Sequence, residues 1–163
     1  MLPAVQPVEI SLLMQLSGLV MSIVLIAIAV LVHFQSLLFL SEWQASLKKS
    51  GSIKMLLIIF GLIAAHIVET VVFAGGYWIG ERGFHLGNFV GVRSMEVKDF
   101  FYFALETFTT QGVGDIYPID PLRLIASLEP LVGLILIGWS ASFTFLMMGR
   151  EWQVDPAPAD STD

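Results

Sequence analysis

The chain has 163 residues, of which 56% are hydrophobic and only 13% are charged, and it contains no cysteine. This composition predicts a membrane protein, and the long apolar segments described below make it an all-α one. The absence of cysteine excludes disulfides, thiolate metal sites and cysteine nucleophiles. The formal net charge of -6 argues against nucleic-acid binding.

The first apolar segment carries no Asp, Glu, Lys or Arg between residues 10 and 41. A spanning helix needs roughly 20 residues, so we expect this helix to be tilted or to continue into the interface. The stretch 35–49 combines Trp43 and two lysines with apolar residues, which is typical of an interfacial segment. We therefore assign 1–54 to an extra transmembrane helix and a cytoplasmic interfacial loop.

The rest of the chain predicts two more spanning helices, at 55–80 and about 121–149. Between them lie a glycine-rich loop and a short helix at about 98–109, which is too short to cross a membrane. The tail 150–163 is acidic and carries prolines, so we expect it to be disordered.

The distribution of basic residues predicts the orientation. Lys48, Lys49 and Lys54 follow the first helix, which favours a cytoplasmic loop there. We therefore expect a multi-pass protein of the cell membrane with an extracytoplasmic N-terminus and a cytoplasmic C-terminus. The longer loop before the short helix also carries basic residues, which weakens the asymmetry.

The segment Thr-Thr-Gln-Gly-Val-Gly-Asp, residues 109–115, follows the short helix directly. Irregular backbone at membrane depth is tolerated only where it is buried in protein or lines a water-filled path. Gly112 and Gly114 can adopt positive φ, which lets successive carbonyl groups point the same way. A row of aligned carbonyl oxygens can replace the hydration shell of a cation.

The order of a short helix, residues 106–115, Tyr117-Pro118 and a last helix resembles the pore domain of tetrameric potassium channels, and most closely the small prokaryotic channels without a voltage sensor. The resemblance is specific from Lys98 to Arg123 and leaves the first helix outside. It implies a pore domain over 55–149, a homotetramer in membrane lipid, passive K⁺ conduction, and no cofactor besides K⁺ in the filter.

The resemblance also implies the roles of individual residues. The selectivity filter would consist of Thr110, Gln111, Gly112, Val113 and Gly114, with K⁺ at the first four. Its support would come from Glu106, Thr109 and Asp115.

Two filter residues depart from the family pattern, because Gln111 and Val113 stand where Val and Tyr are usual. In the family, the Tyr packs against a ring of aromatic side chains around the filter, the aromatic cuff, and forms a hydrogen bond with the short helix before the filter. Val113 can do neither. The amide of Gln111 is an alternative hydrogen-bond donor. Candidates for the cuff are Phe100, Phe101, Tyr102 and Phe103.

We expect a potassium channel with weaker discrimination against sodium. The alternatives are a nonselective cation channel and a non-conducting, channel-like interaction subunit. No enzymatic motif stands out.

Glu106 and Asp115 allow two interpretations. In the small bacterial channels that the chain resembles, the matching carboxyl groups share a proton behind the filter, so that the pair titrates as a unit. Alternatively, Asp115 is a solvated residue at the mouth that attracts cations, and Glu106 only bonds the pore-helix backbone.

A second polar group lies inside the predicted spans. His66 and Glu69 share one helical face, and Glu129 lies at a similar depth on the last helix, so we expect the three to meet. A hydrogen-bonded lock, a proton-sensing gate and a metal site all fit this cluster. His33 and His85 look incidental.

Pro130 and Gly133 interrupt the regular pattern of the last helix. Pro130 cannot donate a helical hydrogen bond, and Gly133 matches the family's hinge position, so together they predict a bend. The alternative for Gly133 is close packing against another helix.

Overall fold

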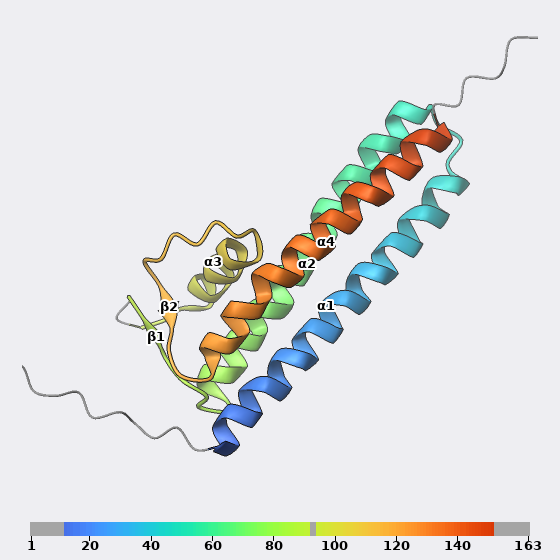
Figure 1. The fold of residues 1–163 in the computed structure, drawn as a ribbon. Helices are drawn as coiled ribbons and strands as arrows, with labels where there is room; N and C mark the ends of the chain where they lie inside the picture. Colours follow the sequence, from blue (N-terminus) through green and yellow to red (C-terminus); the bar gives the residue numbers. More distant parts are fainter. Residues whose placement is uncertain (1–11, 92–93, 152–163) are drawn as a thin grey trace, which may run out of the picture.

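The computed structural model describes residues 12–91 and 94–151, which form helices and one small antiparallel sheet (Figure 1). The elements are α1 (Leu12–Ser46), α2 (Gly51–Arg82), β1 (Phe89–Val90), α3 (Val97–Phe108), β2 (Tyr117–Pro118) and α4 (Leu122–Glu151). Residues 152–163 of the tail that we expected to be disordered lie outside the described residues.

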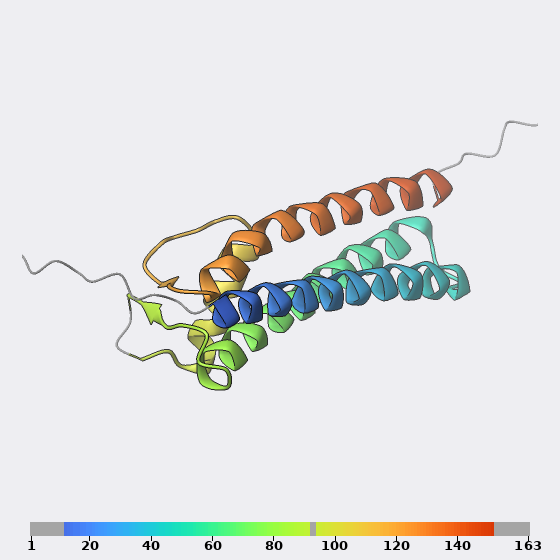
Figure 2. The same cartoon turned by 60° about the horizontal axis from the view of Figure 1, so that its bottom comes forward.

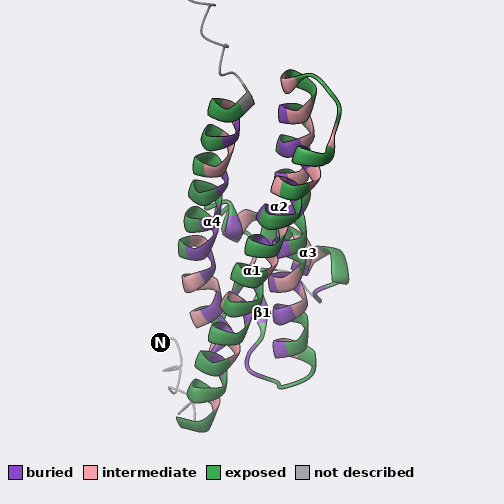
Figure 3. Ribbon diagram, turned by 90° about the vertical axis from the view of Figure 1, so that its right-hand side faces the viewer, coloured by how far each residue is buried: buried purple, intermediate pink, exposed green. Residues whose placement is uncertain are grey.

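The three long helices have the length and apolar composition of membrane spans. Helices α1 and α2 contain 35 and 32 residues, and the apolar part of α4 contains 29, whereas a bilayer needs roughly 20. Their outward faces carry exposed apolar side chains and their inward faces are buried (Figure 3). The predicted all-α membrane fold with three spanning helices is therefore confirmed.

Helix α1 continues through the stretch that we interpreted as interfacial. It runs unbroken to Ser46, and only a short turn separates it from Gly51 at the start of α2. Leu37, Leu40 and Gln44 are buried at helical spacing in this last part. Tertiary packing is what stabilises most helices in proteins, and here Leu37 and Leu40 pack against residues of α2.

The long helices lie side by side, and α1 contacts both α2 and α4 (Figures 1 and 2). Helix α3 and the sheet lie beside α2 and α4, on the opposite side from α1 (Figure 1). This arrangement places the short helix and the loop that follows it on the face of α4 that α1 leaves open.

Helix α3 begins at a capping box and packs through aromatic side chains. The N–H of Glu96 donates to Asp99 Oδ2 at 2.8 Å, and the Glu96 side chain accepts from the backbone of Asp99. Its buried aromatic residues join a core with residues of α2 and β1; the members are Phe73, Tyr77, Phe89, Phe100, Phe103 and Phe108. Strand β2 pairs with β1 in the register Phe89 to Pro118, which holds the far end of the loop after α3.

Candidate functional site

Helix α3 ends in a Schellman motif whose left-handed residue is Thr110. The N–H of Gln111 donates to the carbonyl of Glu106 at 2.8 Å, and the N–H of Thr110 donates to the carbonyl of Thr107 at 3.0 Å. Thr110 has φ of 61°, a conformation that glycine usually adopts and that is unfavourable for a β-branched residue. Strained backbone therefore begins directly after α3, a feature that clusters at functional sites.

Positive φ recurs at every second residue of the loop. The φ angles are 61° at Thr110, 53° at Gly112 and 81° at Gly114, whereas Gln111 and Val113 do not adopt positive φ. When left- and right-handed backbone conformations alternate along a segment, successive peptide groups point in the same direction. Along a β-strand, successive peptide groups point in alternate directions. The positive φ values at these three residues are of the kind that such an alternation requires.

The loop is exposed from residue 109 to 115, and its start lies well along α4. A Cβ placed on Gly133 of α4 would lie 2.1 Å from the carbonyl oxygen of Phe108, the last residue of α3. Gly133 follows Leu122 by 11 residues, which puts the end of α3 about 17 Å along α4 at ~1.5 Å per residue. The described part of one chain leaves this irregular backbone uncovered, so it needs further protein around it or a water-filled path beside it.

A cavity of about 380 Å³ lies behind the loop. Thr110, Gly112 and Gly114 line it from the loop, Glu106 from α3 and Pro130 from α4. Val113 is absent from its lining and is 56% exposed. The loop therefore sends no large side chain into the space behind it.

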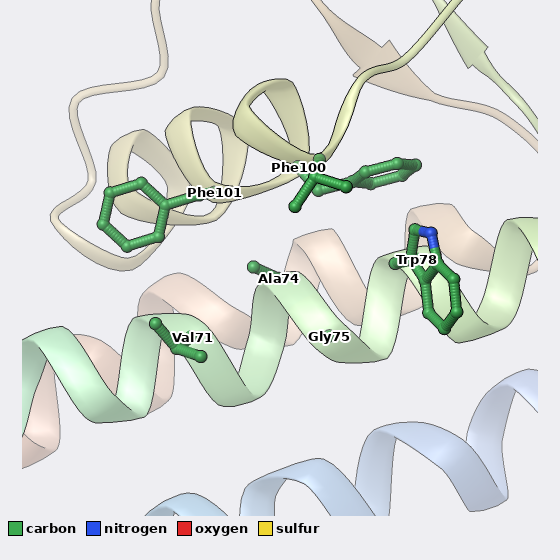
Figure 4. Close-up of a pocket in the computed structure, with 7 residues that line it drawn as sticks. Val71, Ala74, Gly75, Trp78, Phe100 and Phe101 are labelled. Atoms are coloured by element: carbon green, nitrogen blue, oxygen red, sulfur yellow. The ribbon is translucent and has the colours of Figure 1, made fainter.

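The aromatic residues that we proposed as a cuff do not share one face. Phe100 and Phe103 are buried in the chain's own core and contact Phe89 edge-on, with ring centroids 5.6 and 5.0 Å away. Phe101 is half-buried, and together with Phe100 it lines an apolar cavity of about 400 Å³ between α3 and α2 (Figure 4). Tyr102 is the exposed member of the four, which leaves it free to contact another copy of the chain.

Glu106 and Asp115 lie at opposite ends of the loop. Glu106 is half-buried and lines the cavity, whereas Asp115 is exposed. No hydrogen bond or ion pair joins the two within residues 12–91 and 94–151. The exposure of Asp115 supports its interpretation as a mouth residue.

The intramembrane polar cluster forms around Glu69, but with different partners from those expected. Glu69 Oε1 is 2.8 Å from His33 Nδ1, and Glu69 Oε2 is 2.8 Å from His66 Nδ1. Ser140 Oγ lies 3.1 Å from His66 Nε2, so the cluster connects α1, α2 and α4. The interpretation of His33 as incidental is wrong. Its place inside a span without charged residues was the available signal, because ionisable groups in spans usually have interior partners.

Glu129 belongs to a separate pair. The Tyr77 hydroxyl donates to Glu129 Oε2 at 2.5 Å, and both side chains are fully buried. Because Tyr77 follows Glu69 by 8 residues on α2, the pair lies about 12 Å along the helix from the cluster. The expected contact between Glu69 and Glu129 is therefore wrong, because Tyr77 of α2 lies level with Glu129.

The Tyr77 hydroxyl contributes to stability through Glu129. We expect Tyr77→Phe to lower the free energy of unfolding by about 1–3 kcal/mol, because it leaves a second oxygen of the buried carboxyl group without a partner. Glu129→Gln keeps an acceptor for the hydroxyl and should cost less. Thermal unfolding of the detergent-solubilised protein measures both, and equal stability of Tyr77→Phe and wild type would contradict this role.

Helix α4 continues through Pro130 to Glu151. Gly133 is buried, and the Phe108 carbonyl occupies the place of its missing side chain. This contact supports the close-packing interpretation of Gly133, while the bend at Pro130 stays a prediction.

Two spanning helices that flank a short helix and a re-entrant loop define the class of pore-loop membrane channels. The Ion_trans_2 family model, described as an ion channel, matches residues 53–150, and the chain belongs to this ion channel family. The matched residues contain most of α2, all of α3, the loop and most of α4, and they leave α1 outside. No curated protein and no solved structure matches the chain. The family is one of channels and not of enzymes.

Proposed function

We propose that this ion channel is a homotetrameric potassium channel with Thr110 to Gly114 as its selectivity filter. The observation that carries this proposal is the positive φ at Thr110, Gly112 and Gly114, which favours carbonyl groups aligned along one side of the loop. In this proposal the carbonyl oxygens of residues 110–113 replace the hydration shell of K⁺. The Thr110 hydroxyl adds a ligand at the inner mouth.

The exposure of the loop supports assembly around a shared axis. Each chain supplies one such loop, and a ring of ligands around an ion needs several copies. Leu131, Leu134 and Ile135 of α4 are also exposed, and neighbouring copies would cover such a face. Four chains in a closed ring satisfy both requirements and leave the loop around a central path.

The space behind the loop supports weaker discrimination against sodium than a Tyr-bearing filter achieves. The cavity of about 380 Å³ receives no side chain from Val113, and the described part of the chain gives Gln111 no side-chain hydrogen bond. A loop without lateral support can contract around a smaller cation. Selectivity should therefore depend on what residue 113 places behind the filter.

We propose that the filter lies toward the outer face of the cell membrane. Lys48 and Lys49 lie in the turn between α1 and α2, and Lys54 lies in the first turn of α2, at the end of the bundle away from the loop (Figure 1). Positive residues favour the cytoplasmic side. The start of α1 is then extracytoplasmic and the end of α4 cytoplasmic.

The test is cation flux through the purified protein in liposomes under potassium, sodium and caesium gradients. We expect K⁺ flux to exceed Na⁺ flux, and we expect Val113→Tyr to raise the K⁺ to Na⁺ ratio about tenfold, which corresponds to ~1.4 kcal/mol of added discrimination. Equal flux of all three cations would indicate a nonselective channel. No flux across a range of pH would indicate a non-conducting interaction subunit.

A further inference from the structure

We propose that His33, His66 and Glu69 form a binding site for a divalent transition-metal ion such as Zn²⁺, and that the ion fastens α1 to the pore domain. The ligand atoms of these three residues lie within 4.8 Å of one another. His33 comes from α1, and the other two residues come from α2. The site does not depend on the ion that the channel conducts.

The donor set fits Zn²⁺ by type, and side-chain movements can bring its spacing to that of a bound ion. Two imidazoles and one carboxylate make three protein ligands and leave a fourth, open position. Ligands about 2.0–2.1 Å from a tetrahedral ion lie about 3.3 Å apart. His33 Nδ1 lies 2.8 Å from Glu69 Oε1, and His66 Nδ1 lies 2.8 Å from Glu69 Oε2. The three ligand atoms lie within 4.8 Å of one another, so side-chain rotation would have to bring them around one ion.

The charge of the cluster favours a cation. Glu69 is fully buried at membrane depth, where an ionised carboxylate is costly unless a positive charge lies beside it. No lysine or arginine forms an ion pair with Glu69 among the residues that the structure describes; its two partners are imidazoles. A divalent ion at the junction would neutralise the carboxylate without requiring a proton on either ring.

The surroundings supply an outer partner for one ligand. A histidine that binds metal through one ring nitrogen usually has a hydrogen bond on the other, and His66 Nε2 has Ser140 Oγ at 3.1 Å. His33 is fully buried, and its Nε2 has no hydrogen-bond partner. If the cluster is held by hydrogen bonds alone, nothing offsets the free-energy cost of burying His33 Nε2 without a partner. The free energy of metal binding would offset that cost.

The position of the cluster, between α1 and the pore domain, indicates that a bound ion would hold the two together. The channel family match begins at residue 53, so α1 is an addition to the pore domain. His33 joins α1 to α2 at the cluster, and Trp139 of α4 contacts the His33 ring at a centroid distance of 5.3 Å. The side chain of His66 is 21% exposed, whereas that of Glu69 is fully buried, so His66 is the ligand nearer the surface of the chain.

Co²⁺ titration of the purified full-length protein in detergent, after removal of metals with a chelator, tests the site. We expect one Co²⁺ per chain, with the visible absorption of a four-coordinate ion and competition by Zn²⁺. His33→Asn and Glu69→Gln should abolish this absorption. His85→Asn is the matched control, because His85 is exposed in a loop, and it should bind as wild type does.

Two further variants separate coordination from folding. His33→Cys should retain Co²⁺ and add a sulfur-to-cobalt charge-transfer band, which places residue 33 on the ion. Ser140→Ala should weaken Co²⁺ binding about 10- to 100-fold through loss of the outer partner, whereas Ser142→Ala, on the exposed face of α4, should not.

Any of three results would overturn the proposal: no Co²⁺ bound by wild type, absorption retained in His33→Asn, or Co²⁺ bound by His33→Cys without the charge-transfer band. The first would leave the cluster as a hydrogen-bonded lock. Because binding is read in detergent without flux, failure of this proposal and failure of the potassium channel proposal are distinguishable.

Discussion

Replacing Gly112 by alanine should abolish potassium flux. A Cβ at Gly112 would meet no atom within 4 Å, so the effect comes from φ of 53° and not from a clash. The left-handed conformation costs an L-residue roughly 1–2 kcal/mol, which amounts to about 4–8 kcal/mol when four chains carry the change. We therefore expect the conducting geometry to lose about a thousandfold or more in population, measured as K⁺ flux in liposomes.

Gly149→Ala is the matched control for this variant. Gly149 lies in α4 without positive φ, and a Cβ there would also meet no atom within 4 Å. We expect its flux to equal that of wild type. Undiminished flux in Gly112→Ala would show that the left-handed conformation of the loop is not needed for conduction.

Replacing Gly133 by alanine should displace the end of α3 and reduce both stability and flux. The added Cβ would lie 2.1 Å from the Phe108 carbonyl oxygen, which is backbone and cannot rotate away. Overpacking costs about 1–3 kcal/mol, whereas the gain in helix propensity is at most about 1 kcal/mol. The cost of overpacking therefore exceeds the gain in helix propensity. Because Thr110 follows Phe108 by two residues, a displacement of Phe108 also displaces the filter.

Thermal unfolding and K⁺ flux measure this second effect, again beside Gly149→Ala. We expect Gly133→Ala to unfold at a lower temperature and to conduct at least tenfold less. If its stability and flux matched those of Gly149→Ala, α3 would have room to accommodate the side chain, and Gly133 would have no packing role.

Local signals in the sequence were sufficient to predict the elements of the pore domain. The short helix expected at about 98–109 is α3, Val97–Phe108, because its length follows from the loop before it and the glycines after it. The long helices follow from charge-free apolar runs of sufficient length. The long first helix, α1, ends at Ser46, within the stretch 35–49 into which we expected it to continue.

The pairing of polar side chains could not be predicted in the same way. Glu69 pairs with His33, and Glu129 pairs with Tyr77, because the register between neighbouring helices sets which residues are level. Depth estimates from the ends of single helices do not define that register. Likewise, the glycines predicted positive φ at Gly112 and Gly114, but the left-handed Thr110 follows from the Schellman hydrogen bonds at the end of α3.

The most direct test of the filter is a crystal structure of the assembled channel with K⁺ replaced by Rb⁺, whose anomalous scattering locates the ion. The account predicts Rb⁺ on the axis shared by four chains, coordinated by carbonyl oxygens of residues between Thr110 and Val113. An ordered loop without Rb⁺ beside it, or chains that share no such axis, would contradict the account.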